Sequence, residues 1–284
     1  PFLPPRVRPV NGEGARTRPK CLDKRRTSFY SVGARNQVPF SPSEKERLPV
    51  KPKVLITRML PQPALDIALT QCNVDLNRRD VRYAKKQLIR RLKGKAGMIC
   101  LLTDTIDAEV LRKSPHLKVV SNVAAGLDNI DVQAATRHGI MVTNTPGVLT
   151  ETTAEFVWAL LLATARRVVE ADRFVRAGKW KEWMLMGFLG RDLYGKTLGI
   201  CGLGRIGSAV ARRARGFNMR IRYTQRYRNE AKERELNATY MDKMTLLRES
   251  DFLVLVLPLT PETRHFIGPK ELKAMKETAI LINV

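Results

Sequence analysis

TLGICGLGRIG, residues 197–207, is the stretch that decides the fold. Its first half is an apolar run typical of a buried strand, and the sequence that follows it as far as Arg215 favours a helix. Between the two, Gly202, Gly204 and Gly207 have the spacing G-x-G-x-x-G. A strand, this glycine pattern and a helix in direct succession predict a βαβ unit that binds a dinucleotide.

Each glycine has a separate physical role in such a site. Gly202 permits the tight turn, Gly204 lets the backbone approach a pyrophosphate, and Gly207 lets the helix pack closely on the strand. The start of the helix adds unpaired N–H donors for the phosphates. The residues of this turn predicted to contact the cofactor are Gly202, Leu203, Gly204, Arg205, Ile206 and Gly207.

The end of the next predicted strand, MRIRYT at 219–224, indicates which dinucleotide is bound. NAD enzymes have a carboxylate there for the ribose hydroxyls, whereas a nearby Arg suits the additional phosphate of NADP. Gln225 occupies this place, Arg226 and Arg228 follow, and no carboxylate occurs before Glu230. The sequence therefore favours NADP, with NAD as the alternative. The competing interpretation is that both arginines are exposed loop cations.

Two further apolar runs extend the same sheet. DFLVLVLPLT at 251–260 and TAILINV at 278–284 are predicted strands. Ligands of open α/β sheets bind in the crevice at the carboxyl ends of the strands. The predicted ligand residues in these segments are therefore Leu257, Pro258 and Asn283.

The first half of the chain also alternates strands with helices, which indicates an α/β fold with a parallel sheet covered on both faces. The predicted strands are residues 53–57, 74–76, 97–102, 118–123 and 140–144.

After these strands, Thr150 is predicted to cap one long helix from Glu151 to Ala177. At about 1.5 Å per residue it would span roughly 40 Å, long enough to bridge two domains. Its Trp158 is expected in a core rather than at a ligand.

The composition excludes several classes of protein. With 284 residues, of which 44% are hydrophobic, the chain has enough apolar material for buried cores. It has no run of about 20 uncharged apolar residues, so no association with a membrane is expected. Its four cysteines lack CxxC spacing and a neighbouring histidine cluster, so neither a metal site nor a disulfide framework is expected. This pattern suits a reducing compartment, the cytoplasm.

The charge is unusual, with 51 Lys and Arg against 27 Asp and Glu and a formal net charge of +24. Such an excess suggests nucleic-acid binding. However, residues 1–50 hold 11 of the basic and only 4 of the acidic residues, and beyond them the cations are dispersed among acids. No nucleic-acid partner is therefore expected.

Residues 1–50 lack apolar periodicity and are expected to be a disordered basic extension. A transit peptide, a nucleic-acid arm and a non-native extension are the alternatives.

Three long stretches, residues 122–167, 195–221 and 249–268, resemble the D-isomer-specific 2-hydroxyacid dehydrogenases, and within them the glyoxylate/hydroxypyruvate reductases. The resemblance implies a homodimer with two Rossmann-like, doubly wound parallel-sheet domains in each chain. One is a flavodoxin-like substrate domain and the other binds NAD(P). The implied parts are the extension 1–50, the substrate domain 51–150, a linking helix and dimer-arm loop 151–190, and the NAD(P)-binding domain 191–284.

The resemblance also implies a reaction, the NAD(P)H-dependent reduction of a small 2-oxo acid such as glyoxylate or hydroxypyruvate. The alternatives are a phosphoglycerate- or lactate-type dehydrogenase and a non-enzymatic, dinucleotide-sensing corepressor. By resemblance, the substrate contacts Leu102, Ala125 and Gly126, and the cofactor contacts Thr153, Pro258 and Thr263. The Trp-rich loop at 180–190 would cross to the partner subunit.

The catalytic Arg, Glu and His of the family would all lie beyond Val284, so the chain is expected to be a C-terminally truncated fragment. None of the histidines present is expected to replace the catalytic one. His116 and His138 follow helices, and His265 lies past the loop at Pro258.

A polypeptide of these 284 residues is therefore predicted to bind cofactor weakly or not at all and to have no turnover. The measurement is NADPH oxidation in the presence of glyoxylate. Measurable turnover would show that the catalytic groups have been misplaced.

Overall fold

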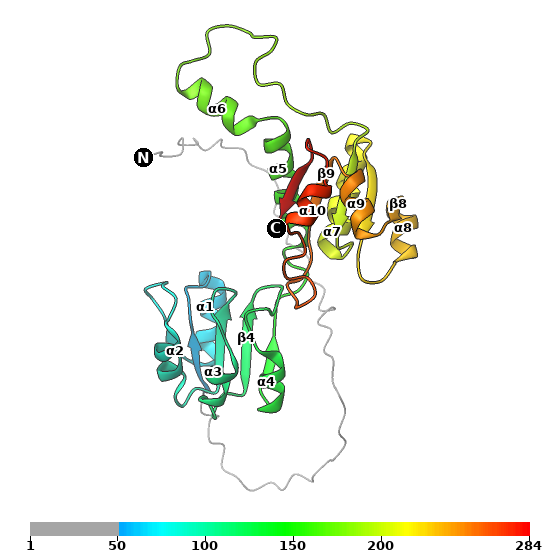
Figure 1. Ribbon diagram of the computed structural model, residues 1–284. Coiled ribbons are helices and arrows are strands. Elements are labelled where there is room, and N and C mark those ends of the chain that lie inside the picture. Colours follow the sequence, from blue (N-terminus) through cyan, green and yellow to red (C-terminus); the bar gives the residue numbers. More distant parts are fainter. Residues whose placement is uncertain (1–50) are drawn as a thin grey trace, which may run out of the picture. The chain divides into compact units, whose positions relative to one another are not determined.

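The computed structural model describes residues 51–284 (Figure 1). The extension predicted for residues 1–50 lies outside the described residues. Two five-stranded sheets form the framework, and every described strand pair is parallel. The predicted α/β class is confirmed.

The first sheet has a flavodoxin-like strand order, as predicted. Its order β2-β1-β3-β4-β5 is the 2-1-3-4-5 arrangement of that fold. The strands are β1 (Lys53–Ile56), β2 (Asn73–Leu76), β3 (Gly97–Leu101), β4 (Val119–Val123) and β5 (Met141–Thr143). The helices that join them are α1 (Gln62–Gln71), α2 (Lys85–Leu92), α3 (Ala108–Arg112) and α4 (Val132–Arg137).

Side chains of β1 pack on both faces of this sheet. Leu55 belongs to a core shared with α2, α3 and α4, whereas Val54 and Ile56 pack with Leu65 of α1. Because successive side chains of a strand point to opposite faces, the single strand joins both cores. The first sheet is therefore covered on both sides.

The second sheet has the order of dinucleotide-binding domains. Counted from its first strand, the order β10-β9-β6-β7-β8 is the arrangement 3-2-1-4-5 read from the other edge. The strands are β6 (Thr197–Cys201), β7 (Arg220–Thr224), β8 (Ala238–Tyr240), β9 (Phe252–Leu255) and β10 (Ile280–Asn283). The helices around it are α5 (Thr150–Ala165), α7 (Arg205–Ala214), α8 (Glu230–Leu236), α9 (Lys243–Glu249) and α10 (Pro269–Ala274).

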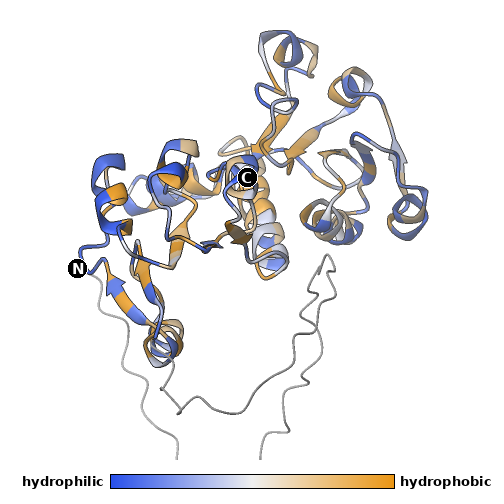
Figure 2. Cartoon of the chain, turned by 90° about the horizontal axis from the view of Figure 1, so that it is seen from below, coloured by the Kyte–Doolittle hydropathy of each residue, from blue (hydrophilic) through white to orange (hydrophobic). Residues whose placement is uncertain are grey.

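Helices α5 and α7 pack on one face of the second sheet, while α9 and α10 pack on the other. Trp158 of α5 is 5% exposed, and its indole Nε1 donates to the carbonyl oxygen of Val210 at 3.2 Å. Its ring stacks on Phe217 with the centroids 4.9 Å apart. The prediction that Trp158 belongs to a core is confirmed. In Figure 2 the hydrophobic residues concentrate in the strands and on the helix faces turned towards them.

The prediction of one long helix over residues 151–177 is wrong. Helix α5 ends at Ala165, and a separate helix α6 (Val168–Arg176) follows it. Arg167, between them, has φ 53° and ψ 34°, a left-handed conformation that an α-helix cannot continue through. Thr150 is also not the cap: Leu149 holds the N-cap position, and its side chain makes no capping hydrogen bond.

Two strand predictions also need correction. The strand predicted over 251–260 is shorter, because β9 covers only Phe252–Leu255 and Pro258, which has no N–H for a ladder, lies in the loop that follows. The three-residue strand β8 was not predicted, because so short a run carries no measurable alternation. Over residues 51–284, no helix combines the length and the apolar character needed to cross a bilayer.

Candidate functional site

The order of the second sheet places several predicted residues at one edge. β6 lies between β7 and β9, so the connections that leave its two sides diverge, and a crevice opens at the carboxyl ends of these strands. The Gly202 N–H donates to the carbonyl oxygen of Thr224 at 2.9 Å, and the Val256 N–H donates to that of Cys201 at 3.0 Å. The glycine turn, the end of β7 and the end of β9 therefore meet here.

The glycine turn is closed on its protein side and open at Gly204. Gly202 has φ +98°, and a Cβ there would lie 2.8 Å from the carbonyl oxygen of Val256. A Cβ at Gly207 would lie 2.0 Å from the carbonyl oxygen of Gly202, so α7 approaches the turn as closely as only glycine allows. A Cβ at Gly204 would meet no atom within 4 Å. This turn fits a pyrophosphate, although contact of its residues with a cofactor stays a prediction.

Two side chains from beyond β7 hold the backbone of the turn. The Leu203 N–H donates to Gln225 Oε1 at 3.2 Å. Lys232 Nζ, from α8, donates to the carbonyl oxygens of Leu203 at 2.6 Å and Gly204 at 3.2 Å. Gln225 was predicted as a site residue, but Lys232 was not. A lysine on an exposed helix carries no local pattern that would distinguish it from a solvated one.

The two arginines after β7 have different surroundings. Arg226 lies over the ring of Tyr227, 5.3 Å from its centroid. Arg228 donates from Nε and Nη2 to the two carboxylate oxygens of Glu233, at 2.8 and 2.9 Å. Cofactor contact stays a prediction for both arginines. Arg226 is stacked on an aromatic ring, whereas Arg228 is already paired with a carboxylate.

Glu233 is a carboxylate that the sequence analysis missed. Besides the bonds from Arg228, it accepts a hydrogen bond from the Tyr223 hydroxyl at 2.8 Å. The hydrogen bonds from Arg228 and Tyr223 lower the pKa of Glu233 to about 2. Since Tyr223 lies in β7, these contacts bring an ionised carboxylate from α8 to the end of that strand, where sequence spacing alone placed none.

The remaining predicted residues of the second sheet lie around one hollow. Leu257, Pro258, Thr263 and Asn283 line it, and His265 lines it too. The Thr263 hydroxyl donates to the carbonyl oxygen of Pro258 at 2.5 Å and closes the loop after β9. Leu257 also borders the glycine turn, because a Cβ on Gly202 would lie 3.1 Å from its Cδ2.

Some predicted residues lie outside this hollow. Thr153 lies in the first turn of α5, is half-buried, and does not line the hollow. His116 and His138 are exposed. Among the described residues, no carboxylate lies within hydrogen-bonding distance of the His265 ring. The structure thus gives none of the three histidines a carboxylate partner of the kind a catalytic acid requires.

The predicted substrate residues lie at the carboxyl ends of β3 and β4 in the first sheet. Leu102 follows β3, Ala125 and Gly126 follow β4, and all three are exposed. Their two turns are joined by Asn129, whose Nδ2 donates to the carbonyl oxygens of Leu101 at 3.1 Å and Asp104 at 3.0 Å. These side-chain bonds tie the chain after β4 to the turn after β3.

Buried polar groups complete this connection. Asn122 donates from Nδ2 to Asn129 Oδ1 at 2.9 Å and to the carbonyl oxygen of Gly126 at 3.0 Å. Asp104, 2% exposed, accepts from the Leu101 N–H at 3.0 Å and from the Thr57 hydroxyl. The residues predicted from the sequence are the exposed members of these turns, and Asn122, Asn129 and Asp104, which hold the turns, are not among them.

The comparisons with known proteins agree with this arrangement. Residues 158–284 match the family described as "D-isomer specific 2-hydroxyacid dehydrogenase, NAD binding domain". A glyoxylate reductase from Korarchaeum cryptofilum is 54% identical over 235 residues, which are 82% of this chain and 71% of that protein. The resemblance seen in the sequence is confirmed.

Solved structures agree in fold. The TT0316 protein from Thermus thermophilus is 44% identical with a TM-score of 0.76, covering 81% of this chain and 73% of that one. An acyclic imino acid reductase (Bsp5), solved with NADPH and D-Arg, is 28% identical with a TM-score of 0.73, over 81% and 73% of the two chains. The matches name both NAD and NADPH, and the cofactor class they share is a nicotinamide dinucleotide.

Two glycine substitutions should distinguish the packing of α7 against the turn from the binding of a dinucleotide at the turn. Gly207→Ala is expected to lower the free energy of unfolding by about 1–3 kcal/mol, because its methyl group would overlap the carbonyl oxygen of Gly202. Gly204→Ala should change that free energy by less than about 0.5 kcal/mol but weaken dinucleotide binding, since its methyl group would stand in the open cradle. Urea unfolding and NADPH titration measure the two effects. Equal destabilisation by both variants would contradict the assigned roles.

Proposed function

The chain belongs to the D-isomer-specific 2-hydroxyacid dehydrogenase family, and we propose that it reduces glyoxylate or hydroxypyruvate to the corresponding 2-hydroxy acid. It is an oxidoreductase that acts on a CH–OH group and uses a nicotinamide dinucleotide. The observation that carries the proposed substrate is the 54% identity to a glyoxylate reductase. The open cradle at Gly204 supports the cofactor part independently of that identity.

The residues of this chain would bind and orient the reactants. Backbone N–H groups at Ala125 and Gly126 would bind the substrate carboxylate, and the link through Asn129 would keep their turn in register with that of Leu102. The turn at Gly204 and the start of α7 would bind the pyrophosphate. The dinucleotide, when bound, supplies the reducing equivalents. Among residues 51–284 we assign no catalytic acid.

We further propose NADP(H) rather than NAD(H) as the preferred cofactor. Gln225 stands where NAD enzymes have a carboxylate, and its Oε1 already accepts a hydrogen bond from the glycine turn. Arg226 and Arg228 would supply positive charge for the 2′-phosphate. Glu233 opposes this preference in part, because it neutralises Arg228.

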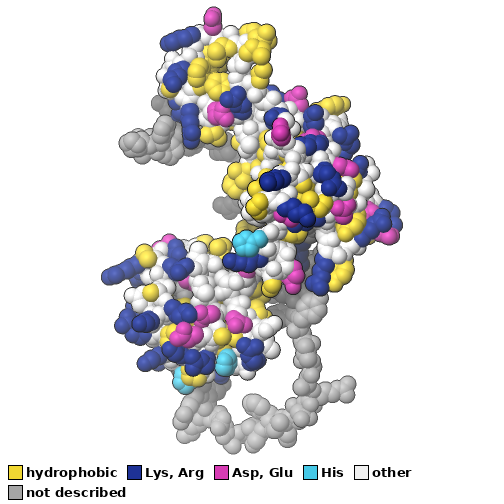
Figure 3. Space-filling view, in the orientation of Figure 1, with side chains coloured by type: hydrophobic (Ala, Val, Ile, Leu, Met, Phe, Trp, Pro, Cys, Tyr) yellow, Lys and Arg dark blue, Asp and Glu magenta, His cyan; other side chains and the backbone are white. Residues whose placement is uncertain are grey.

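Of the net charge of +24, only the cations near the cofactor site are part of the proposed function. On the face seen in Figure 3, acidic side chains stand among the Lys and Arg of both sheets. This mixture supports the proposal that the protein has no nucleic-acid partner. We also propose the cytoplasm as its compartment, since Cys72, Cys100 and Cys201, the cysteines among the described residues, are free thiols.

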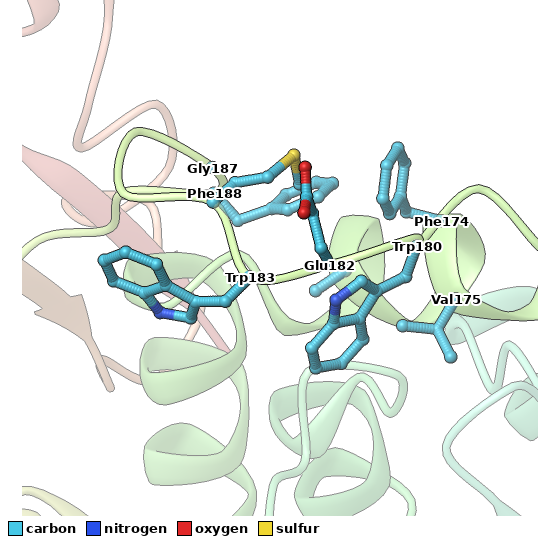
Figure 4. A pocket seen from close by; sticks show the side chains of 9 residues that line it. Phe174, Val175, Trp180, Glu182, Trp183, Gly187 and Phe188 are labelled. Atoms are coloured by element: carbon cyan, nitrogen blue, oxygen red, sulfur yellow. The ribbon is translucent and has the colours of Figure 1, made fainter.

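A homodimer is proposed from the segment that follows α5. In this arm, which we define as residues 168–190, α6 and the Trp-rich loop enclose an apolar hollow (Figure 4). It is lined by Phe174, Val175, Trp180, Trp183 and Phe188 among others. Trp183 is 74% exposed and Met186 75% exposed. Apolar side chains gathered in this way favour a protein interface, and the family resemblance makes a second copy of this chain the occupant.

Replacing Trp183 by Asp is expected to convert the dimer into a monomer, because a charge would enter the centre of the covered surface. Sedimentation equilibrium measures the mass. Val81→Asp is the matched control, since Val81 is 66% exposed but belongs to the first sheet's part of the chain. A wild-type protein that sediments as a monomer would contradict the proposed dimer.

The proposed reaction is tested with a version of the protein in which the family's Arg-, Glu- and His-bearing segment follows Val284. We expect the highest kcat/KM with glyoxylate or hydroxypyruvate, lower values with pyruvate and phosphohydroxypyruvate, and a preference for NADPH over NADH of about tenfold or more. Higher activity with pyruvate or phosphohydroxypyruvate would indicate a lactate- or phosphoglycerate-type enzyme. Dinucleotide binding without turnover of any 2-oxo acid would favour the corepressor.

A further inference from the structure

Lys232 is a lysine whose side chain reaches the cofactor turn from a neighbouring helix. The Asn229 side chain accepts from the Lys232 backbone N–H at 3.1 Å and so caps the start of α8. This cap fixes the helix position from which the Lys232 side chain reaches Leu203 and Gly204. The contact joins α8, the helix that follows β7, to the turn that we propose for the pyrophosphate.

The charge of Lys232 is not neutralised by an ion pair within residues 51–284. Its hydrogen-bond acceptors are the two neutral backbone carbonyls, whereas Glu235 acts on it only at longer range. Burial lowers the pKa of the Lys232 ammonium, and Arg205 and Arg212 add further positive charge nearby. An ammonium group has three N–H donors, and the carbonyls of Leu203 and Gly204 take two of them. One donor and a full charge remain for an anion.

Arg228 differs from Lys232 on this point. Both carboxylate oxygens of Glu233 accept from its guanidinium, and the Tyr223 hydroxyl holds Glu233 in place. An anion that recruited Arg228 would have to break this bidentate pair. Among the described residues, three cations at this end of the site lack such a bidentate partner. Arg226 stacks on Tyr227, with the Glu262 carboxylate within electrostatic range. Arg205 lies at the start of α7 close to Lys232, and only Lys232 among the three also hydrogen-bonds to the glycine turn.

We propose that Lys232 is a specificity-determining residue of the cofactor site: its ammonium group holds the Leu203–Gly204 backbone and donates to the 2′-phosphate of NADP(H). This inference rests on the proposed use of NADP(H) and names the residue that reads its additional phosphate. Arg226 is the second cation of this subsite, and Arg228 with Glu233 forms its structural border.

The test compares two probes that differ only in the 2′-phosphate, namely adenosine 2′,5′-bisphosphate and 5′-AMP. Each is titrated up to millimolar concentration and followed by amide NMR shifts. The protein used is the version in which the family's C-terminal segment follows Val284, because the 284-residue chain is itself expected to bind cofactor weakly or not at all. The wild type should bind the bisphosphate more tightly. Lys232→Met should weaken bisphosphate binding about tenfold, as expected for the loss of a charged hydrogen bond, and change 5′-AMP binding less than about twofold.

Three further variants test whether the charge of Lys232, rather than its hydrogen bonds to the turn, determines bisphosphate affinity. Lys232→Gln keeps a donor for the turn without the charge, so it should lose bisphosphate affinity as Lys232→Met does while preserving the fold. Lys232→Arg should retain most of the affinity. Lys51→Met is the matched control: Lys51 Nζ also donates to a backbone carbonyl, that of Leu69 at 3.3 Å, but it lies in the first sheet's part of the chain and should affect neither probe.

The outcomes separate this inference from the proposed function. Equal weakening of both probes by Lys232→Gln would show that Lys232 only shapes the turn, and unchanged binding would show that it does not contribute; either result overturns the inference. A selective loss in Arg228→Met but not in Lys232→Gln would assign the phosphate to Arg228 instead. A wild-type chain that does not prefer the bisphosphate over 5′-AMP would overturn the NADP(H) proposal itself, and this inference with it.

Discussion

The approach of α7 to the carbonyl oxygen of Gly202 is the contact on which the cofactor site depends. Only a residue without a Cβ at position 207 lets the helix begin so close to the end of β6. With the helix in that place, its first N–H groups point into the space beside Gly204, and the residues after β7 can reach the turn. One steric requirement therefore sets where α7 begins relative to the glycine turn, and with it the backbone donors that we propose for the pyrophosphate.

In the first sheet, the backbone of the turns after β3 and β4 is held in place by polar side chains instead of by a close glycine contact. The turns predicted to bind the substrate are exposed, but Asn122, Asn129 and Asp104 hydrogen-bond to their backbones. A buried amide or carboxylate left without partners costs about 1–3 kcal/mol, so each of these groups favours a single arrangement of the turns. The backbone donors that would bind a carboxylate are thereby fixed before any substrate arrives.

The sequence predicted what depends on local pattern. Nine of the ten strands, the close packing of Gly202 and Gly207 and the burial of Trp158 follow from apolar runs and from spacing within a few residues, whereas the short strand β8 does not. The contacts of Lys232 and Glu233 could not be predicted, because they depend on how far α8 is set from the turn in space. The break at Arg167 was missed for a related reason: nothing in the sequence there, neither Gly nor Pro, announces a left-handed residue. Short-range signals thus predict which turns form the candidate site, and tertiary contacts determine which of its cations are paired with carboxylates.

The composition of the two cores has a consequence for synthesis on the ribosome. Every strand of the first sheet has been made once Thr143 is added, whereas the second core unites Ala154 of α5 with Ile282 of β10. At about 5–20 residues per second, roughly 7–28 s separate these two points of translation. The nascent chain can therefore complete the first sheet while the apolar face of α5 is still uncovered. During that interval we expect the emerging protein to be most prone to aggregation.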